Sequence, residues 1–489
     1  MSKLNKFFSK PSIFWRDFFL KRAPLEFGNN VQALPTEKGH NTLKPKSKVT
    51  VDKTNSQKAV KMVDSADLED LYPVTFPIDI VYTWVDSNDI EFIRNKNKYE
   101  NVISEMQKEK EEISDIARFE SHDELKYSIR SIFEYAPWVN HIYIVTNGQI
   151  PKWLDSECSK VSIITHDQII DREYLPTFNS HVIESSLHKI PGLSEHYIYF
   201  NDDVMLTRPI KPEYFFTSSG LAKVFITNSL LPDGPKNIND TPTQWASKNS
   251  RALLFDKTKF FARNMFAHTF FPQLKSVHEK MESLWAKEYH KCRLNRFRGE
   301  SDLTIVTFLH NHFALIFGNA IAARTTCMYF NIRAPMAENY YKSLLARQGS
   351  DNAPYSMCLN DHKSNLAVKL DEHENKLRAF LDSYYPNSAE HEIYLLTKNE
   401  LLTLLNNGFY KEIYISLNRI IKYDIIPITK KNIYVVYYYA LTCYELYKIN
   451  GKNKYLDKAT RALDLVLNIA PSHKAALTLK NTVSQVMGK

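Results

Sequence analysis

The stretch SEHYIYFNDDVMLTRP, residues 194–209, decides the fold of this chain. Its residues 197–200 alternate aromatic and β-branched side chains, which is typical of a buried strand. Asn201, Asp202 and Asp203 follow at the point where that strand must end. Adjacent carboxylates repel each other, so burying them requires water, a basic group or a cation nearby. The stretch therefore predicts either a strand-end Mg²⁺ site or an Asx turn whose carboxylates face solvent.

A second stretch, PIDIVYTWVDSND at residues 77–89, has the same design. A β-branched run ends abruptly in polar residues, which indicates a strand followed by a polar turn. In open α/β sheets this is where ligand-binding residues lie. The charged segment that follows, residues 90–117, has helical propensity and is predicted to be a solvated excursion.

Residues 118–166 predict a helix between further strands. Apolar side chains repeat at helical spacing until Pro137, and apolar runs at 141–145 and 161–166 each end in polar residues. The alternation of strands and helices predicts an α/β sheet. The strand-end clusters would lie along one edge of it, where a nucleotide sugar could bind.

Composition narrows the class of protein. A chain of 489 residues with 28 Tyr, 28 Phe and only 12 Gly is globular and long enough for two or three domains. The net charge of +8 is too modest to indicate nucleic-acid binding. Five scattered cysteines without CxxC spacing predict reduced thiols and a cytoplasmic setting, against a disulfide frame or a cysteine zinc site. No apolar run approaches transmembrane length, and no signal peptide is recognisable.

The chain divides into four predicted parts. Residues 1–27 form a basic, aromatic arm that either lies on an anionic membrane or packs on the protein itself. Residues 28–76 read as a polar linker, and residues 77–386 as the α/β domain. Residues 387–489 predict an all-α domain of tetratricopeptide-like hairpins, which would grip the polymer or a partner, or cover the sheet.

Four separated blocks of the sequence resemble, in order, the four conserved regions of the Stealth family. They are IDIVYTWVDSND, the run from Arg118 to NDDV, AHTFFPQ with RFRGESD, and CLND. Family members are hexose-1-phosphate transferases, including bacterial capsule polymerases. The resemblance implies a nucleotide-sugar-binding core, Rossmann-like or GT-A-like. It also implies transfer of N-acetylglucosamine 1-phosphate from UDP-GlcNAc to an oligosaccharide-phosphate acceptor, with UMP released and Mg²⁺ required. Such an enzyme would work in the cytoplasm, at the inner face of the bacterial inner membrane, near the capsule export machinery.

The resemblance also assigns roles to residues. The catalytic candidates are His268 as first choice of base, Arg298 as phosphate clamp, Asp203, and Asp302 and Asp86 as alternative bases. The metal candidates are Asp202 and Asp203, with Asp361. The substrate-binding candidates are Thr83, Trp84, Asn147, Gly148, Gln149, Arg118, Lys126, Arg130 and Asn360.

The chain departs from the family pattern at two places: the second histidine of the AHxxH-like block is absent, and VDSND lacks a loop glycine. Three other functions stay open at this point. The same chemistry could use another hexosamine 1-phosphate. A conventional UDP-sugar glycosyltransferase would release UDP instead of UMP. A carbohydrate-binding or scaffold protein would have no activity, although the intact acid pair argues against this reading.

Overall fold

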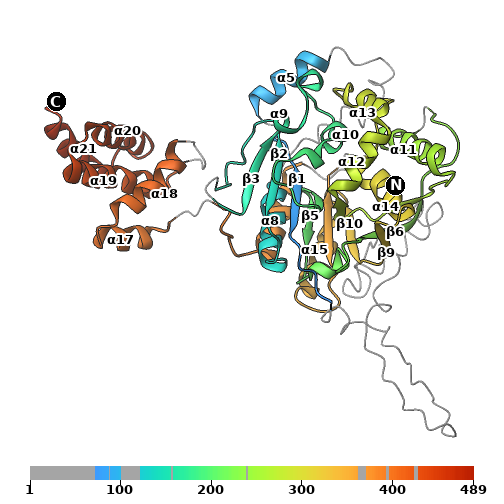
Figure 1. Cartoon of the computed structure of the whole chain (residues 1–489). Helices are drawn as coiled ribbons and strands as arrows, with labels where there is room; N and C mark the ends of the chain where they lie inside the picture. The colour runs from blue at the N-terminus through green and yellow to red at the C-terminus, as the bar shows by residue number, and fades with distance from the viewer. Residues whose placement is uncertain are drawn as a thin grey trace, which may run out of the picture. The chain divides into compact units, whose positions relative to one another are not determined.

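The computed structural model describes residues 72–86, 89–100, 122–155, 158–237, 240–361, 370–392, 396–422 and 428–488. The chain forms two compact units (Figure 1). The helical unit comprises Ile150–Asp155 and Glu390–Lys489, and the sheet unit comprises the rest of the chain up to Ala389. The expected boundary at residue 387 lies close to this division, but nothing in the sequence indicates that residues 150–155 belong with the C-terminal helices. The predicted arm, residues 1–27, and the linker up to residue 71 lie outside the described residues.

A five-stranded sheet with the order β3-β2-β1-β4-β8 forms the centre of the sheet unit. Its strands are β1 (Ile78–Thr83), β2 (Ile142–Thr146), β3 (Val161–Thr165), β4 (His196–Asn201) and β8 (Phe271–Leu274). The first four are parallel, and β8 runs antiparallel to β4. The prediction of an α/β fold with a parallel sheet is confirmed. The finer likeness to a GT-A-like core stays a prediction.

Buried apolar side chains explain why these strands and the first long helix form. Ile80, Val81, Ile144 and Ile198 are at most 1% exposed, as parallel strands covered on both faces require. Helix α8 (Glu124–Tyr135) buries its apolar stripe against the sheet region, and the hydroxyl groups of Tyr82 and Ser128 hydrogen-bond at 2.8 Å. Each such apolar burial contributes roughly 1.5–3 kcal/mol.

Two smaller sheets complete the unit. One has the order β10-β11-β5 and the other β7-β6-β9. Their strands are β5 (Val204–Leu206), β6 (Ala222–Leu230), β7 (Asn264–Phe266), β9 (Ala320–Ala323), β10 (Cys327–Asn331) and β11 (Ser356–Asn360). Only Asp202 and Asp203 separate β4 from β5, so the acidic pair crosses from the central sheet to the β10-β11-β5 sheet.

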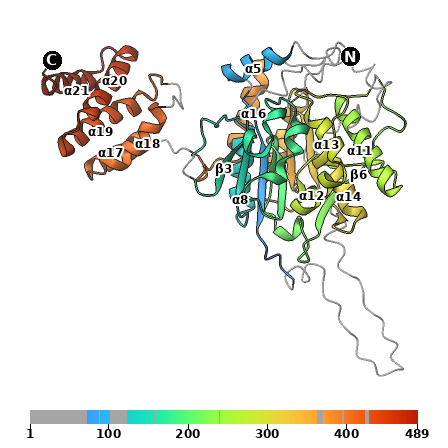
Figure 2. The same ribbon diagram turned by 45° about the horizontal axis from the view of Figure 1, so that its top comes forward.

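The remaining helices of the sheet unit surround these sheets. In Figures 1 and 2, α11 to α14 gather on one side of it. The longer helices are α5 (Ile90–Glu100), α11 (Pro242–Thr258), α12 (Lys275–Leu284), α13 (Ala286–Arg293), α14 (His310–Ile316), α15 (Ala337–Arg347) and α16 (Leu370–Tyr384). The short ones are α9 (His166–Ile169), η3 (Arg172–Tyr174), α10 (Ser180–Glu184), η4 (Leu187–Lys189), η5 (Pro212–Tyr214) and η6 (Ile305–Leu309). No helix in the described ranges is both long and apolar enough to span a lipid bilayer.

The helical unit contains α17 (Lys398–Asn406), α18 (Tyr410–Lys422), α19 (Ile433–Asn450), α20 (Asn453–Ile469) and α21 (Lys474–Val486). Ala440, Ala459 and Ala462 are buried in its core, where small side chains let neighbouring helices approach closely. Segment 150–155 joins this unit through a bridge between Leu154 and Glu392 and a 2.7 Å hydrogen bond from the Asp155 amide to the His391 carbonyl. The tetratricopeptide-like character of the unit stays a prediction.

Candidate active site

The ends of β1 and β4 fix the position of the site. Thr83 and Asn201, the last residues of these parallel strands, are register partners. β2 and β3 lie on one side of β1, and β4 lies on the other, so the strand order reverses between β1 and β4. In open α/β sheets, ligands bind outside the carboxyl ends of the strands at such a reversal. The polar residues that follow both strands therefore meet at one edge of the sheet.

The acidic pair is half-buried and lies in a strongly charged environment. Burial, followed by the charges of Asp203 and Glu124, raises the pKa of Asp202 well above its usual range. Asp203 Oδ2 accepts a hydrogen bond from Cys358 Sγ at 3.2 Å, whereas its buried Oδ1 has no partner among the described residues. A buried carboxylate oxygen without a donor is costly, and a cation would satisfy it.

Mg²⁺ fits this donor set. It takes oxygen ligands, which Asp202 and Asp203 supply, and it usually keeps positions for phosphate oxygens. Burial and then the charge of Asp203 raise the pKa of Cys358 well above its usual value, and its Sγ donates a hydrogen bond to Asp203 Oδ2. The carboxylate pair is therefore the part of this cluster suited to a hard cation.

Asp361 was predicted to be a third metal ligand, and the structure gives it a different partner set. Arg333 holds both of its oxygens, through Nε to Oδ1 and through Nη2 to Oδ2 at 2.7 Å. His122 Nε2 also donates to Oδ2, at 3.2 Å. Burial opposes ionisation of Asp361, but these hydrogen bonds outweigh it and lower the pKa. Asp361 thus pairs with Arg333 and His122, and its role as a metal ligand stays a prediction.

His268 lies beside the acidic pair. It sits between β7 and β8, and because β8 pairs with β4, the imidazole reaches Asn201. Asn201 Nδ2 lies 3.3 Å from His268 Nε2. An amide nitrogen only donates, so Nε2 accepts this hydrogen bond, which orients the imidazole. One ligating atom each of Asp203, His268 and Cys358 lies within 4.8 Å of the others.

Asp302, predicted as an alternative base, is enclosed by hydrogen-bond donors in the structure. It is fully buried and accepts hydrogen bonds from Asn179 Nδ2, Asn295 Nδ2, the Gly299 amide and His181 Nδ1. These donors occupy both carboxylate oxygens, so Asp302 has no free position for an acceptor proton. Its contacts instead fix the loop that carries Arg298.

Arg298 reaches two helix beginnings from that loop. Its Nη1 donates to Thr243 Oγ1 at 3.1 Å on α11, and its Nη2 donates to Ser180 Oγ at 3.2 Å on α10. These hydroxyl groups help to hold the guanidinium in place, and its charge also acts on Glu184. That charge suits a phosphate oxygen.

Glu184 and Tyr199 connect the Arg298 region to the acidic pair, and the sequence reasoning missed both. Burial raises the pKa of Glu184, although the charges of His181 and Arg298 act to lower it. The Oε2 atom of Glu184 has no hydrogen-bond partner among the described residues. The fully buried Tyr199 hydroxyl hydrogen-bonds Thr83 Oγ1 at 2.9 Å, and the charges of Glu184, Asp202 and Asp203 act on it. The available signal in the sequence was a carboxylate, Glu184, that directly follows the apolar pair Val182 and Ile183.

The loops after β1 and β2, where uridine contacts were predicted, are joined to each other. Gln149 Oε1 accepts from the Asp86 amide and its Nε2 donates to the Asp86 carbonyl, both at 2.9 Å. Asn147 and Gly148 are exposed, and Trp84 is half-buried. Gly148 has a φ of +104°, which explains the glycine at this turn. The loop residues Ser87 and Asn88 lie outside the described residues.

The remaining substrate candidates lie in different surroundings. Arg130 is buried, and it donates to the Tyr385 carbonyl at 2.6 Å and to Ser388 Oγ at 3.4 Å. These contacts support the packing of α8, and a substrate role for Arg130 stays a prediction. Lys126 is half-buried on the first turn of α8. Asn360, at the end of β11, donates to Tyr329 Oη. Arg118 lies outside the part of the chain that the structure describes.

Comparison with known proteins places the chain in a family. It matches the models of Stealth protein conserved region 1 over residues 76–101, region 2 over 118–224 and region 3 over 267–316. It is 38% identical over 370 residues to "Capsular polysaccharide phosphotransferase fcs1" of Haemophilus influenzae, covering 75% of this chain and 95% of that protein. It is 37% identical over 396 residues to "Capsular polysaccharide phosphotransferase" of Neisseria meningitidis serogroup B, covering 80% of this chain and all of that protein.

Among solved structures, the chain is similar to a crystal structure of the galactosyltransferase LgtC with donor and acceptor sugar analogues, and the match covers 62% of this chain. The sequence identity is 11% and the TM-score 0.29, too low to support an argument on fold or chemistry. The sequence relatives decide the family assignment, because they are 37% and 38% identical to this chain across nearly their whole length. This chain belongs to the Stealth family.

Proposed function

We propose that this chain transfers N-acetylglucosamine 1-phosphate from UDP-GlcNAc to a hydroxyl group of a growing capsular polysaccharide and releases UMP. One observation carries most of the proposal: the half-buried pair Asp202–Asp203 at the β1/β4 strand reversal, in a chain whose relatives are named capsular polysaccharide phosphotransferases. That position suits the diphosphate of a nucleotide sugar. The product would be a phosphodiester-linked polymer.

In the proposed reaction, the acceptor oxygen attacks the β-phosphorus of UDP-GlcNAc. The new bond joins the acceptor oxygen to that phosphorus, and the bond from phosphorus to the oxygen of UMP breaks. The bond between the sugar carbon C1 and its oxygen stays intact, so the anomeric configuration is retained without a nucleophile on the enzyme. Catalysis then rests on orientation and on stabilising charge at the phosphate oxygens.

The described residues divide these tasks. His268, whose ring lies beside Asn201 with Nε2 3.3 Å from the Asn201 Nδ2 atom, is the proposed base for the proton of the acceptor hydroxyl. Arg298 binds a non-bridging phosphate oxygen while Thr243 and Ser180 hold its guanidinium. Asp202 and Asp203 would hold Mg²⁺, which when bound neutralises phosphate charge and makes UMP a better leaving group. Asp302 keeps the Arg298 loop in position through the Gly299 amide and Asn295.

Two alternatives use the same site. Another hexosamine 1-phosphate would need only a different contact to one sugar hydroxyl or acetamido group. A conventional glycosyltransferase would place the acceptor oxygen against C1 and release UDP. A strand-end acid pair serves nucleotide sugars in both reactions. We favour phosphotransfer because the sequence relatives are named capsular polysaccharide phosphotransferases.

The proposed partners follow from the rest of the chain. The acceptor is an oligosaccharide that carries phosphate, for which the +8 net charge is suitable. The basic arm, residues 1–27, would bring the enzyme to an anionic membrane at the inner face of the bacterial inner membrane. The helical unit would contact the polymer or the capsule export machinery. Deleting residues 1–27 should move the protein from the membrane to the soluble fraction while sparing activity on soluble primers.

The test is extension of a fluorescent phosphorylated oligosaccharide primer by the full-length protein with Mg²⁺. We expect UDP-GlcNAc to support extension, and UDP-GalNAc and UDP-glucose to support at least about ten-fold less, the effect of one well-placed polar contact. Asp203→Asn and His268→Ala should each lose on the order of 10²–10³-fold in rate, and the exposed control Asp256→Asn should lose none. Full activity in both site variants would contradict the site assignment, and preference for another donor would contradict the proposed sugar.

A further inference from the structure

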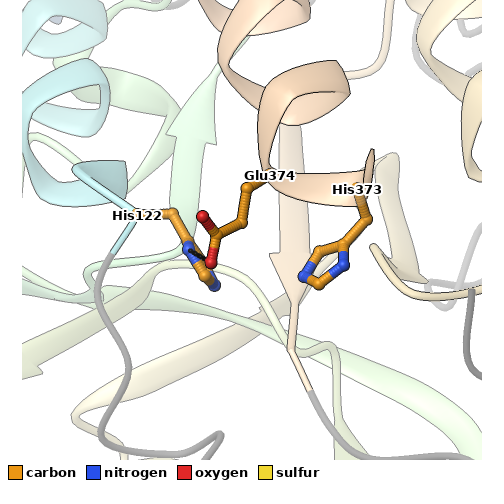
Figure 3. A group of neighbouring side chains, drawn as sticks. All are labelled: His122, His373 and Glu374. Atoms are coloured by element: carbon orange, nitrogen blue, oxygen red, sulfur yellow. Dashed lines mark ion pairs between the residues drawn. The ribbon is translucent and has the colours of Figure 1, made fainter. Parts of the chain in front are cut away.

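A second cluster of ligand-type side chains lies outside the acidic pair. His122 immediately precedes α8, and His373 and Glu374 lie near the beginning of α16. Figure 3 shows the three side chains turned toward one another from these two segments. One ligating atom from each lies within 4.8 Å of the other two, and His122 Nδ1 is 3.4 Å from Glu374 Oε1. That separation resembles the spacing of two ligands about a tetrahedral ion.

An outer layer of polar residues orients His122. Its Nε2 donates to Asp361 Oδ2 at 3.2 Å, and Arg333 holds Asp361 from the opposite side. Donation from Nε2 leaves Nδ1, the nitrogen facing Glu374, available as a ligand atom. A carboxylate that fixes a histidine from behind is the common second layer of histidine metal sites.

His373 supplies an independent observation. Its side chain is only 4% exposed, yet neither of its ring nitrogens has a hydrogen-bond partner within the described part of the chain. A buried donor or acceptor left unpaired costs about 1–3 kcal/mol. The His373 ring packs edge-on against His122, with centroids 5.9 Å apart.

We propose that His122, His373 and Glu374 form a binding site for a transition-metal cation of the Zn²⁺ type. Two imidazoles and one carboxylate are the protein ligands of many zinc sites, with water in the fourth position. Imidazole ligands favour such an ion over Mg²⁺, so this site and the acidic pair would select different metals. The ion would link the beginning of α16 to the beginning of α8. Through Asp361 it would also stabilise the end of β11, where Asn360 lies.

A metal-free ion cluster is the competing explanation. A protonated His122 shared between Asp361 and Glu374 would account for the contacts of His122, and their charges favour that form. It would leave both nitrogens of His373 unpaired in a buried position. Only the metal site gives His373 a partner, so the two explanations differ most at this residue.

The test uses Co²⁺ as a spectroscopic probe on the full-length protein after treatment with chelator. We expect one equivalent to produce visible absorption bands typical of low-coordinate cobalt, and one equivalent of Zn²⁺ to displace it. His122→Gln and His373→Gln should each weaken Co²⁺ binding at least about 100-fold, because each removes one of the three proposed protein ligands. The control His290→Gln, which alters an exposed histidine bonded to Tyr174, should bind like the unchanged protein.

Two further measurements make the result decisive. Zn²⁺ should raise the melting temperature of the unchanged protein but not of His373→Gln, whose metal-free melting temperature checks that the variant folds. Cys358→Ser alters the other group of ligand-type side chains, Asp203, His268 and Cys358, and should leave the cobalt signal intact. A signal lost in Cys358→Ser and kept in His373→Gln would overturn the proposal, as would absence of stoichiometric binding to the unchanged protein. Neither result depends on transferase activity.

Discussion

The thiol of Cys358 donates a hydrogen bond to Asp203 Oδ2 across 3.2 Å. This contact joins the CLND block to the NDD block, which lie 155 residues apart in the chain. It exists because β11 pairs with β5, so that Cys358 lies opposite Val204, directly after Asp203. The hydrogen bond orients one carboxylate oxygen and leaves Oδ1 for a cation.

Replacing Cys358 tests this orientation. Cys358→Ala removes the donor, and at about 1 kcal/mol for one hydrogen bond we expect the Mg²⁺ concentration for half-maximal activity to rise roughly five-fold. Cys358→Ser keeps a donor and should stay within about two-fold of the unchanged protein. The measurement is a Mg²⁺ titration of primer extension. Identical titrations for Cys358→Ala and the unchanged protein would show that the thiol does not orient Asp203.

Arg298→Lys should lower kcat/KM on the order of 100-fold, because a lysine cannot contact Thr243 and Ser180 and still present a fork to phosphate. Arg296→Lys is the matched control. Arg296 is two residues away and donates to the Pro176 carbonyl at 2.7 Å, so we expect less than about three-fold loss of activity. Equal losses in the two variants would indicate general loosening of the loop and not loss of a phosphate contact.

Gly299→Ala should disturb the loop that carries Arg298. An added Cβ would approach Asn295 Cγ at 2.7 Å, and Asn295 is held by Asp302 at 2.7 Å and Ser301 at 2.8 Å. Overpacking of this kind costs about 1–3 kcal/mol. Urea unfolding measures the loss. In an Asn295→Ala background the same substitution should cost less, and an unchanged cost would exclude this steric contact.

Glu282 predicts a pH-dependent stability. Burial opposes its ionisation, but hydrogen bonds from His188 and Arg293 outweigh it and lower its pKa well below the usual value. A lowered carboxylate pKa stabilises the fold at pH values above the ordinary pKa near 4.5, and that stability is lost as the pH falls. Glu282→Gln should therefore reduce the free energy of unfolding by roughly 1–3 kcal/mol at pH 7.

The difference between Glu282→Gln and the unchanged protein should shrink as the pH is lowered from about 5 toward 3, in urea unfolding followed by circular dichroism. Glu279→Gln, on the same helix, is the control and should change stability by less than about 0.5 kcal/mol at either pH. A penalty for Glu282→Gln that stays constant with pH would show that packing, and not the charge, is responsible.

Strands that end in polar residues were readily predicted. The runs before Thr83, Thr146 and Asn201 are apolar because both faces of a parallel sheet are covered, and the polar residues that follow identify its carboxyl edge. Periodicity carries this local information. It therefore indicated the central sheet and placed the acidic pair at its edge.

Non-local contacts were not predictable from the sequence alone. The pairing of β5 with β11 depends on register between distant segments, so the contact between Asp203 and Cys358 left no local pattern. The same is true of ion pairs: Asp361 is bound by Arg333, and Asp302 is enclosed by four donors, and neither fact shows in spacing. The acidic residues of the conserved blocks, such as Asp302 and Asp361, thus appear equivalent in the sequence, although in the structure they have different hydrogen-bond partners.

The most direct measurement follows the β-phosphorus of the donor. The full-length protein is incubated with Mg²⁺, a phosphorylated primer and UDP-GlcNAc labelled with ³²P in the β-phosphate, and the label is traced in polymer and released nucleotide. We predict that the label enters the polymer while unlabelled UMP is released in equal amount. Label released as UDP, with none in the polymer, would mean attack at the sugar carbon and would contradict the account.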